Sequence, residues 1–417
     1  MGPFLNVERS LTGRRWVGPD LKVARQGEAI AQATGLPAPL CNVLAKRGVT
    51  PQDADAFLAP TLKDLLPNPR SLRDMEKATA RILAAVKARQ KIAIFADYDV
   101  DGGTSAALII DWLRHFDQSA TLYIPDRIDE GYGPNDEAMA MLAAAHDLII
   151  CVDCGTLSHG PIAAAVGADV VVLDHHLGGE TLPPAHAVVN PNRADETGDL
   201  AHLCAAGVVF LMLVEAGRQL RIDNATGPNL LNMLDLVALG TVADVAPLIG
   251  VNRALVRQGL TVMARRERTG ITALADVSRM DTAPSSYHLG FLLGPRVNAG
   301  GRIGKADLGA RLLATRDPHE AKAMAERLDM LNTERREIEN NVRAAALEQA
   351  EERGFDEPLV WAAGEGWHAG VVGIVASRLK DAAHRPAIVI GFDGDAGKGS
   401  GRSISGVDLG AAIQKLA

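Results

Sequence analysis

The chain of 417 residues has no long apolar segment and few cysteines. No apolar run approaches the roughly 18 residues that a membrane-spanning helix needs. The first five residues, from Met1 to Leu5, lack the basic and apolar regions of a secretory signal. Four cysteines are too few for a disulfide framework. We therefore expect a cytoplasmic protein with no membrane partner.

Two of the cysteines, Cys151 and Cys154, have the CxxC spacing of zinc and redox sites. No second CxxC and no HxxxH accompanies them, and Cys151 closes an apolar run. We favour core packing for this pair, with a metal or redox site as the alternative.

Aromatic residues and positive charge are also scarce. Aromatics make up 4% of the residues, which argues against a wide platform for base stacking. The 43 basic residues against 51 acidic ones give a net charge of −8, which argues against a broad basic surface for nucleic acid. A narrow basic groove stays compatible with this balance. Of the basic residues 32 are arginine. That choice either suits bidentate phosphate contacts or reflects the base composition of the gene.

The pattern of apolar runs predicts an α/β fold. Hydrophobic residues make up 47% and charged residues 23%, ordinary values for a globular protein, and the length predicts two or three domains. Short β-rich runs alternate with helical stretches, which is typical of βαβ units and a mostly parallel sheet. The predicted strands are 91–96, 120–124, 147–152, 169–173 and 187–189.

A long helix and a second α/β unit are predicted after these strands. Asp317-Pro-His-Glu320 is a helix N-terminal signature, and the apolar periodicity that follows stops at Gly354. We expect a partly solvated rod that joins two domains, with a coiled-coil dimer as the alternative. Beyond it we predict strands 358–362 and 386–392, a helix at 370–380 and a glycine-rich loop at 397–404. The predicted domains are an N-terminal segment packed on the core, a large domain, the long helix and a smaller domain, at 1–70, 71–312, 313–354 and 355–417.

Carboxylates follow three successive predicted strands directly. They are Asp97, Asp99 and Asp101, then Asp153, and then Asp174 with His175 and His176; Asp244 ends a helical run further on. Ligands bind at the carboxyl ends of parallel strands, and clustered carboxylates need a counter-charge. Taken alone, the acidic run is explained equally well as a capped turn, a lone aspartate is better explained as a helix cap or turn residue, and the His-His pair is better explained as a polar pair at the surface or in the core. Together they predict a site for two Mg²⁺ or Mn²⁺ ions. Enzymes of phosphoryl transfer use such a pair to bind the attacking water and the leaving oxygen.

Four of these segments resemble the ordered motifs of the DHH phosphoesterase superfamily: Asp97–Ser105, Val152–Gly155, Leu173–His176 and Ala238–Asp244. Within it the chain is similar to the RecJ family of bacterial single-strand-specific exonucleases. The segments that carry this closer similarity are 125–127, 130–133, 188–192, 294–302, 366–379 and 399–403.

The resemblance implies an architecture and an activity. The architecture is a DHH domain with a mostly parallel sheet, a long connecting helix, and a smaller α/β DHH-associated domain across a cleft. The activity is 5′→3′ degradation of single-stranded DNA to mononucleotides with two Mn²⁺ or Mg²⁺ ions, in DNA repair and recombination. A 5′-phosphorylated single strand would be the substrate, a single-strand-binding protein and a helicase the partners, and the chain a monomer.

Carried over position by position, the resemblance also assigns residues. The metal ligands would be Asp97, Asp99, Asp101, Asp153, His175 and Asp244, with Asp153 bridging the two ions. Asp174 would orient the imidazoles and His176 would contact the scissile phosphate, completing a catalytic set with Asp153. Phosphates of the strand would be held by Arg127, Arg296, Ser400 and Arg402.

Two glycine-rich stretches support phosphate binding independently, because glycine lets a backbone approach an anion. To the residues above we add Asn298 and Arg302 from 294–302, and His368, which precedes the predicted helix 370–380 and its anion-favouring N-terminus. A solvated turn is the alternative for each glycine-rich stretch, and a helix cap or core position is the alternative for His368.

Two departures from the family pattern stand out. The Gly-Gly-His…Ala-Ala-Gly segment and the oligonucleotide-binding barrel of the family are absent before Ala417, so we expect a partial DHH-associated domain and weaker single-strand binding. Cys154 stands where the family pattern has Asn. The alternatives to an exonuclease are a phosphoesterase acting on short oligonucleotides or cyclic dinucleotides, and a non-catalytic nucleic-acid-binding scaffold.

Overall fold

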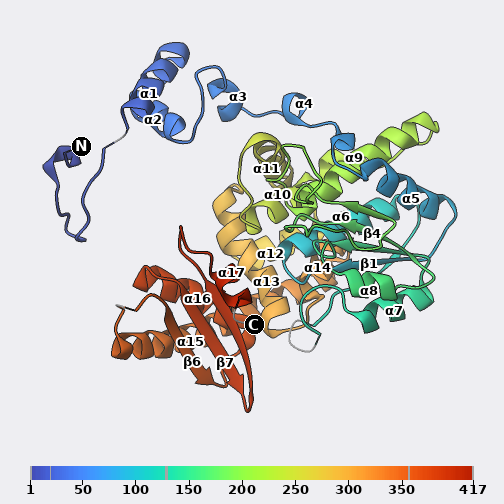
Figure 1. Ribbon diagram of the computed structural model, residues 1–417. Coiled ribbons are helices and arrows are strands. Elements are labelled where there is room, and N and C mark those ends of the chain that lie inside the picture. Colours follow the sequence, from blue (N-terminus) through green and yellow to red (C-terminus); the bar gives the residue numbers. More distant parts are fainter. Residues whose placement is uncertain (1, 19, 127–129, 356, 416–417) are drawn as a thin grey trace. The chain divides into compact units, whose positions relative to one another are not determined.

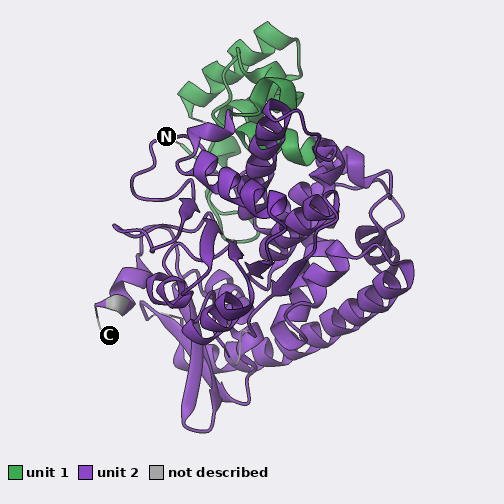
Figure 2. Ribbon diagram, turned by 90° about the vertical axis from the view of Figure 1, so that its right-hand side faces the viewer, with its two compact units in different colours: residues 1–67, 248–257 green, residues 68–247, 258–417 purple. Residues whose placement is uncertain are grey.

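The computed structural model describes residues 2–18, 20–126, 130–355 and 357–415. The chain divides into two compact units, coloured separately in Figure 2. The first consists of residues 1–67 and 248–257, and the second of residues 68–247 and 258–417. The domain boundaries predicted at residues 70, 312 and 354 stay predictions.

The first unit is built from short helices around a small core. Its elements are η1 (Phe4–Asn6), α1 (Leu21–Thr34), α2 (Ala38–Lys46), α3 (Ala54–Leu58), α4 (Leu62–Leu65) and the beginning of α11 (Gly250–Met263). Asp20 caps α1 by accepting a hydrogen bond from the Lys22 N–H, and Gly35 ends that helix at a φ of 70°. Ile30, Cys41 and Leu44 fill the core between α1 and α2.

A five-stranded parallel sheet forms the centre of the second unit. The strand order is β2-β1-β3-β4-β5, and the strands are β1 (Ile92–Ala96), β2 (Ala120–Tyr123), β3 (Leu148–Val152), β4 (Asp169–Leu173) and β5 (Ala187–Val189). All residues of β1 and β3 are buried, because helices cover both faces of the sheet (Figure 1). The five strands and the α/β fold predicted from the sequence are confirmed.

Besides α11, nine helical elements accompany this sheet between residues 68 and 277 of the described chain. They are η2 (Pro69–Ser71), α5 (Met75–Lys87), α6 (Val100–Arg114), α7 (Asp136–Ala145), α8 (His159–Ala164), α9 (Ala205–Ile222), η3 (Leu230–Met233), α10 (Leu234–Ala243) and α12 (Thr269–Val277), with α11 between the last two. Cys151 and Cys154 lie in the core cluster that joins one sheet face to α7 and α8. Core packing of the CxxC pair is thus confirmed. No helix among the described residues is long and apolar enough to cross a membrane.

The long helix lies where its capping signature predicts. η4 (His288–Leu293), α13 (Gly294–Ile303) and α14 (Leu308–Ala314) lead into α15 (Pro318–Arg353). The Asp317 carboxylate accepts hydrogen bonds from the N–H groups of His319 and Glu320. The first half of α15 packs on α12, α13 and α14, and its second half packs on α16 (Ala369–Ala383) and β6 (Val360–Glu365). Its apolar side is used within the chain, as expected of a connecting rod.

A second sheet of three strands follows the long helix. β6 pairs in parallel with β7 (Ala387–Asp393), and β7 pairs in antiparallel fashion with β8 (Ala396–Arg402); α17 (Leu409–Gln414) comes last. The predicted strand 358–362 begins two residues later and continues to Glu365.

Both glycine-rich stretches are regular elements, which corrects the expectation of loops. The stretch 294–302 lies within helix α13, where a Cβ on Gly301 would overlap the Tyr98 ring. The stretch 397–402 lies within β8, where a Cβ on Gly397 would stand 2.7 Å from the Phe392 ring. These glycines let elements pack closely instead of forming turns.

Candidate metal centre

The strand order brings the predicted acidic residues together at one edge of the sheet. β3 lies between β1 and β4, and the last paired residues are Ala96 with Val152 and Val152 with Leu173. The next residue of each strand is therefore Asp97, Asp153 or Asp174, side by side. A parallel register thus converts three separate sequence motifs into one cluster.

The segment after β1 folds tightly into α6, and this fixes two carboxylates. Asp99 caps α6 and accepts hydrogen bonds from the N–H groups of Asp101 (2.8 Å) and Gly102 (3.2 Å). A Cβ on Gly102 would overlap the Asp97 carbonyl oxygen, so only glycine fits this turn. The Asp101 carboxylate accepts from the N–H groups of Ala205 (2.6 Å) and Ala206 (2.9 Å), at the N-terminus of α9. It is held by a helix dipole as well as by two hydrogen bonds.

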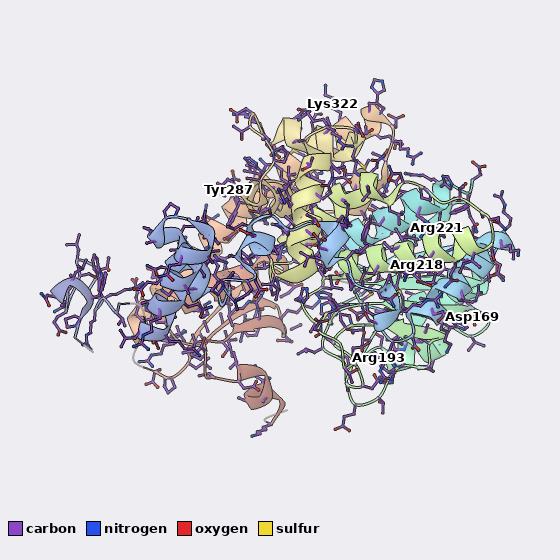
Figure 3. The ribbon with its side chains drawn as sticks, turned by 90° about the horizontal axis from the view of Figure 1, so that it is seen from above. Asp169, Arg193, Arg218, Arg221, Tyr287 and Lys322 are labelled. Carbon is purple, nitrogen blue, oxygen red and sulfur yellow. The ribbon has the colours of Figure 1, made fainter. Side chains whose placement is uncertain are left out.

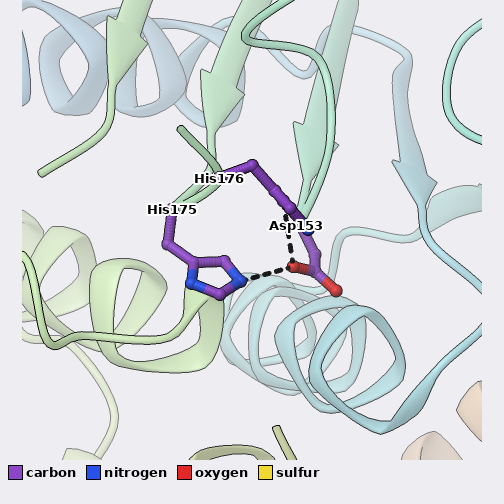
Figure 4. A group of neighbouring side chains, drawn as sticks. All are labelled: Asp153, His175 and His176. Atoms are coloured by element: carbon purple, nitrogen blue, oxygen red, sulfur yellow. Dashed lines mark ion pairs between the residues drawn. The ribbon is translucent and has the colours of Figure 1, made fainter. Parts of the chain in front are cut away.

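Asp153 has an unusual backbone conformation. Its φ is 61°, in the left-handed region that costs a residue other than glycine of order 1–3 kcal/mol, a strain that collects at functional sites. Its Oδ1 is buried and has no hydrogen bond from any residue that the structure describes, and it lies 3.2 Å from Nε2 of His175 (Figure 4). The same Nε2 lies 3.7 Å from Asp101 and 4.0 Å from Asp244.

Asp174 binds one of the two imidazoles. Its Oδ1 accepts from the His176 backbone N–H (3.2 Å) and lies 2.8 Å from His176 Nδ1, while its Oδ2 accepts from the Thr156 hydroxyl (2.6 Å). Although burial opposes it, the hydrogen bonds from His176 and Thr156 lower the pKa of Asp174. The hydrogen bond with Asp174 in turn raises the pKa of His176. His175 is fixed through its backbone, because its carbonyl accepts from the Asn192 side chain (2.6 Å).

Three overlapping groups of side chains could each hold a metal ion. Within each group the ligand atoms all lie within 4.8 Å of one another. The groups are Asp97, Asp99 and Asp153; Asp101, His175 and Asp244; and Asp153, His175 and His176. Asp153 belongs to two of them, as a residue that bridges two ions would.

The electrostatics of the cluster call for cations from outside the chain. Burial first, and then Asp99 and Asp101, raise the pKa of Asp153 well above its ordinary value. Burial, and then Asp101 and Asp99, raise the pKa of Asp244 to about 8. In the described part of the chain, the ion pairs of Asp101, Asp153 and Asp244 go to the two histidines and to no lysine or arginine. Buried oxygen ligands with imidazole nitrogens fit hard divalent cations such as Mn²⁺ or Mg²⁺.

The predicted phosphate-binding residues lie on α13, α16 and β8, and several already have partners. The Arg296 guanidinium pairs with Asp329 (2.8 Å), and Arg302 donates to the Gly370 carbonyl (3.0 Å). Asn298 accepts from the Val100 N–H (3.1 Å), inside the first acidic motif. Their binding of phosphate stays a prediction.

The other predicted phosphate contacts surround α16. His368 caps this helix by accepting a hydrogen bond from the Gly370 N–H (3.0 Å). This is the helix-cap role given above as the alternative to phosphate binding. Arg402 donates to the hydroxyl of Ser400 on β8 (2.9 Å) and to that of Ser377 on α16 (3.2 Å). Arg127 lies outside the described residues.

The sequence reasoning missed two sets of residues. Tyr132 lies in the segment 130–133, and its hydroxyl is 3.1 Å from His176 Nε2. A cavity of about 420 Å³ lies between α13, α15 and α16, with Asn298 and Arg302 on its wall. Its other basic residues are Arg335, Arg336 and Arg378. They come from helices far apart in the sequence, so that no local signal marks them.

Family models match both halves of the second unit. A model described as the N-terminal domain of the DHH family matches residues 91–241. A model described as the DHHA1 domain matches residues 356–417. The first contains the acidic cluster, and the second begins just after the long helix.

Curated relatives match most of the chain. The chain is 42% identical over 398 residues to the single-stranded-DNA-specific exonuclease RecJ of Dickeya dadantii, covering 91% of this chain and 68% of the relative. It is 37% identical over 377 residues to the RecJ of Bacillus subtilis, covering 89% of this chain and 47% of that relative. The chain thus spans from about half to two thirds of the length of these relatives.

Solved structures show the same architecture. A crystal structure of exonuclease RecJ bound to manganese matches with a TM-score of 0.72 and 33% identity, covering 82% of this chain and 85% of that one. The RecJ of Thermus thermophilus in complex with Mn²⁺ matches with a TM-score of 0.80 and 30% identity, covering 95% of this chain and 56% of that one. The same protein with Mg²⁺ matches with a TM-score of 0.72 and 28% identity, covering 95% and 54%.

Proposed function

The chain belongs to the RecJ family of single-stranded-DNA-specific exonucleases, and from this premise we propose that it hydrolyses single-stranded DNA from the 5′ end to mononucleotides. One observation carries the proposal: three overlapping acid and histidine groups gather at the carboxyl ends of β1, β3 and β4 and the end of α10, and within each group the ligand atoms lie within 4.8 Å of one another. The pair of Mn²⁺ or Mg²⁺ ions that these groups would hold, when bound, polarises the phosphate and lowers the pKa of the attacking water.

The ligand roles follow from the positions of the oxygens. Asp97 and Asp99 would hold one ion, Asp101, His175 and Asp244 the other, and Asp153 both. The backbone at Asp153 is held in its strained conformation by the hydrogen bond from its N–H to the Leu173 carbonyl (3.0 Å). This conformation directs the carboxylate to the centre of the cluster.

His176 is suited to meet the charge that develops on the phosphate. Its Nδ1 is held by Asp174 at 2.8 Å, and its Nε2 lies 3.1 Å from the Tyr132 hydroxyl, so Nε2 would contact a substrate in place of that hydroxyl. The side chain is 45% exposed, and the raised pKa favours the protonated, donating form. A charged donor aimed at the developing oxyanion stabilises the transition state.

The finer features of the substrate and its setting belong to the same proposal. Arg402 and Ser400 on β8, with Arg296 and Arg302 on α13, would hold a 5′-phosphorylated end and neighbouring phosphates. Four free, buried cysteines suit a reducing compartment, hence the cytoplasm. We propose that the chain acts there as a monomer in DNA repair and recombination, on strands delivered by a helicase or covered by a single-strand-binding protein.

The test is a timed digestion of a 30-nucleotide single strand labelled at either end, with Mn²⁺ and with Mg²⁺. We expect the 5′ label to appear at once as mononucleotide, whereas the 3′-labelled strand shortens gradually, and duplex DNA stays intact. Faster hydrolysis of a dinucleotide than of the 30-mer would instead favour a phosphoesterase for short substrates. Absence of hydrolysis together with no stoichiometric Mn²⁺ would favour a binding scaffold.

A further inference from the structure

Two aromatic rings of the second unit lie side by side in solvent. Tyr287, just before η4, is 59% exposed, and Phe291 within η4 is 65% exposed. Their ring centroids are 5.2 Å apart and their planes differ by 24°, so that they stack. Tyr287 is labelled in Figure 3. A contiguous exposed apolar patch of this kind marks an interaction site more often than a lone exposed side chain does.

Packing of the fold does not account for these rings. Tyr287 and Phe291 are four residues apart and so share one face of the helical segment. Leu289 and Leu293, also four residues apart, are fully buried and fill the core from the other face. Leu289 and Leu293 already pack the segment onto the core, so the fold does not need the exposed aromatic pair for that purpose.

The helical segment that carries these rings also packs against residues next to the proposed metal ligands. A Cβ on Gly290 would stand 3.5 Å from Val242, and a Cβ on Gly294 would stand 3.3 Å from Ala243. These two neighbours directly precede Asp244, one of the proposed ligands. Further along, Asn298 binds the Val100 N–H between Asp99 and Asp101. The aromatic pair therefore lies at the start of a continuous helical segment, η4 followed by α13, that contacts two of the acidic motifs.

Phe291 also lines the cavity of about 420 Å³ between α13, α15 and α16. Four arginines line this cavity against one glutamate, Glu339. Arg335 is the most buried of them: its side chain is 9% exposed, and its terminal nitrogens pair with Glu339 (2.5 Å) and Asn332 (3.1 Å). Its Nε is buried and has no hydrogen-bond partner among the described residues. A buried donor without a partner fits an acceptor oxygen brought by a ligand.

We propose that Tyr287 and Phe291 are a stacking site for the nucleobases of the single strand, whose phosphates contact the arginines of this cavity. The inference rests on the proposed function, because it takes single-stranded DNA as the ligand. Every base has a π-face, so the site would be indifferent to sequence, as an exonuclease requires. It would reject duplex DNA, because paired and stacked bases leave no face free for an aromatic ring.

The charge of the cavity favours a nucleic acid over a protein segment. Arg336 and Arg378 extend from α15 and α16 around the same space as the unsatisfied Arg335 Nε. Several cationic groups beside an apolar ring pair match a polyanion that carries flat apolar faces. The low aromatic content of the chain excludes a wide platform, and it is compatible with this narrow one.

The test compares Phe291→Ala, Tyr287→Ala and the double variant with Trp361→Ala. Trp361 is a matched control: it is 45% exposed on β6 in the same unit and has the Arg353 guanidinium 3.8 Å over its ring, away from the cavity lining. Binding of a fluorescent thymidine 15-mer is measured by anisotropy with Ca²⁺, an oxygen-seeking cation, in place of Mn²⁺ to prevent cleavage. We expect Phe291→Ala to weaken binding roughly 5- to 100-fold. Trp361→Ala should bind like the parent chain, and Phe291→Trp should restore binding.

A series of 15-mers with one abasic site at successive positions separates stacking from packing. In the parent chain one or two positions should lose affinity when the base is removed, and in the double variant the same positions should lose none. Unchanged binding by the double variant, or an abasic penalty that persists in it, would overturn the inference. A chain that shows this coupling but does not cut the labelled strands would refute the proposed function and leave the stacking site standing. A chain that cuts the labelled strands but shows no coupling between the abasic site and the aromatic pair would support the proposed function and refute the stacking site.

Discussion

Two clusters of buried carboxylates lie in the same unit of the chain and are neutralised differently. In the arginine-centred cluster, Arg268 pairs with Asp111 (2.6 Å) and Asp235 (2.8 Å). Although burial opposes it, the arginine lowers the pKa of Asp111. In the metal-centre cluster, formed by Asp101, Asp153 and Asp244, the described partners are histidines and backbone N–H groups.

The comparison shows two ways in which buried acids can be neutralised. Both clusters bury acids that would repel each other in a low dielectric. The fold supplies a permanent cation to one of them, although burial still raises the pKa of Asp235 there. In the other, the pKa values of Asp153 and Asp244 are raised, and the described ion pairs go to no lysine or arginine. The cluster without a chain cation is the one in which an external cation can bind and act. The following predictions, from the largest expected effect to the smallest, test whether the two clusters differ in this way.

The largest effect is expected from Asp153→Asn. Asparagine tolerates the positive φ of this position and keeps the shape of the side chain, but it removes the charge that would bridge two cations. We expect single-strand hydrolysis in Mn²⁺ to fall by at least about a thousandfold. The metal-free variant should at the same time melt at a higher temperature than the parent, because one repelling charge is gone.

A matched control for Asp153→Asn is Asp169→Asn. Asp169 lies at the opposite end of β4, half exposed and paired with Arg81. The control should keep the parent rate of hydrolysis. Comparable losses in both variants would mean that the rate reports folding and not the metal-centre cluster.

The next effect in size concerns stability and the other cluster. Arg268→Met leaves Asp111 and Asp235 buried without their shared cation, which costs about 3–5 kcal/mol. Arg266→Met, two residues away, removes an exposed pair with Asp276 and should cost less than about 1 kcal/mol. Urea unfolding of the two variants measures the difference. Equal costs would show that the Arg268 cation is dispensable and that the comparison fails.

A smaller effect should come from metal addition. Mn²⁺ at a hundred times its dissociation constant should stabilise the metal-free chain by about 2.7 kcal/mol. Arg268→Met should gain as much as the parent, because its lost cation belongs to the other cluster, whereas Asp153→Asn should gain much less. Thermal melts in EDTA and in Mn²⁺ give these values. A gain that survives intact in Asp153→Asn would place the metal elsewhere in the molecule.

The sequence predicted the metal-centre cluster and missed the arginine-centred one for a geometric reason. Asp153 directly follows β3, and Asp101 ends the acidic run that directly follows β1, so the local pattern and the parallel register bring these two together. Asp244 ends helix α10, and the family resemblance assigned it to the cluster. Arg268 and Asp111 are 157 positions apart, and no local pattern links them. The arginine-lined cavity could not be predicted either, because its walls come from three separate helices.

The glycine-rich stretches show a second limit of prediction from sequence. From the sequence alone, the glycines of 294–302 and 397–404 indicate backbone that approaches an anion or forms a turn. Gly301 instead allows α13 to approach Tyr98, and Gly397 lies under the Phe392 ring in β8. Glycine marks close approach as well as turns, and only tertiary packing tells the two apart.

The smallest of the expected effects tests how rigidly the fold holds Asp101. A Cβ on Gly240 of α10 would stand 2.5 Å from the Thr104 hydroxyl and 2.8 Å from Asp101 Oδ1. We therefore expect Gly240→Ala to destabilise the chain by about 2 kcal/mol through overpacking and to weaken Mn²⁺ binding by moving the Asp101 carboxylate. Gly217→Ala in α9, where the nearest atom would be the end of the Arg221 side chain at 3.7 Å, is the matched control and should be neutral or slightly stabilising. Calorimetric titration with Mn²⁺ separates the two consequences. A destabilised variant with unchanged Mn²⁺ affinity would mean that Asp101 serves α9 alone, and that the metal is held by the remaining acids of the cluster.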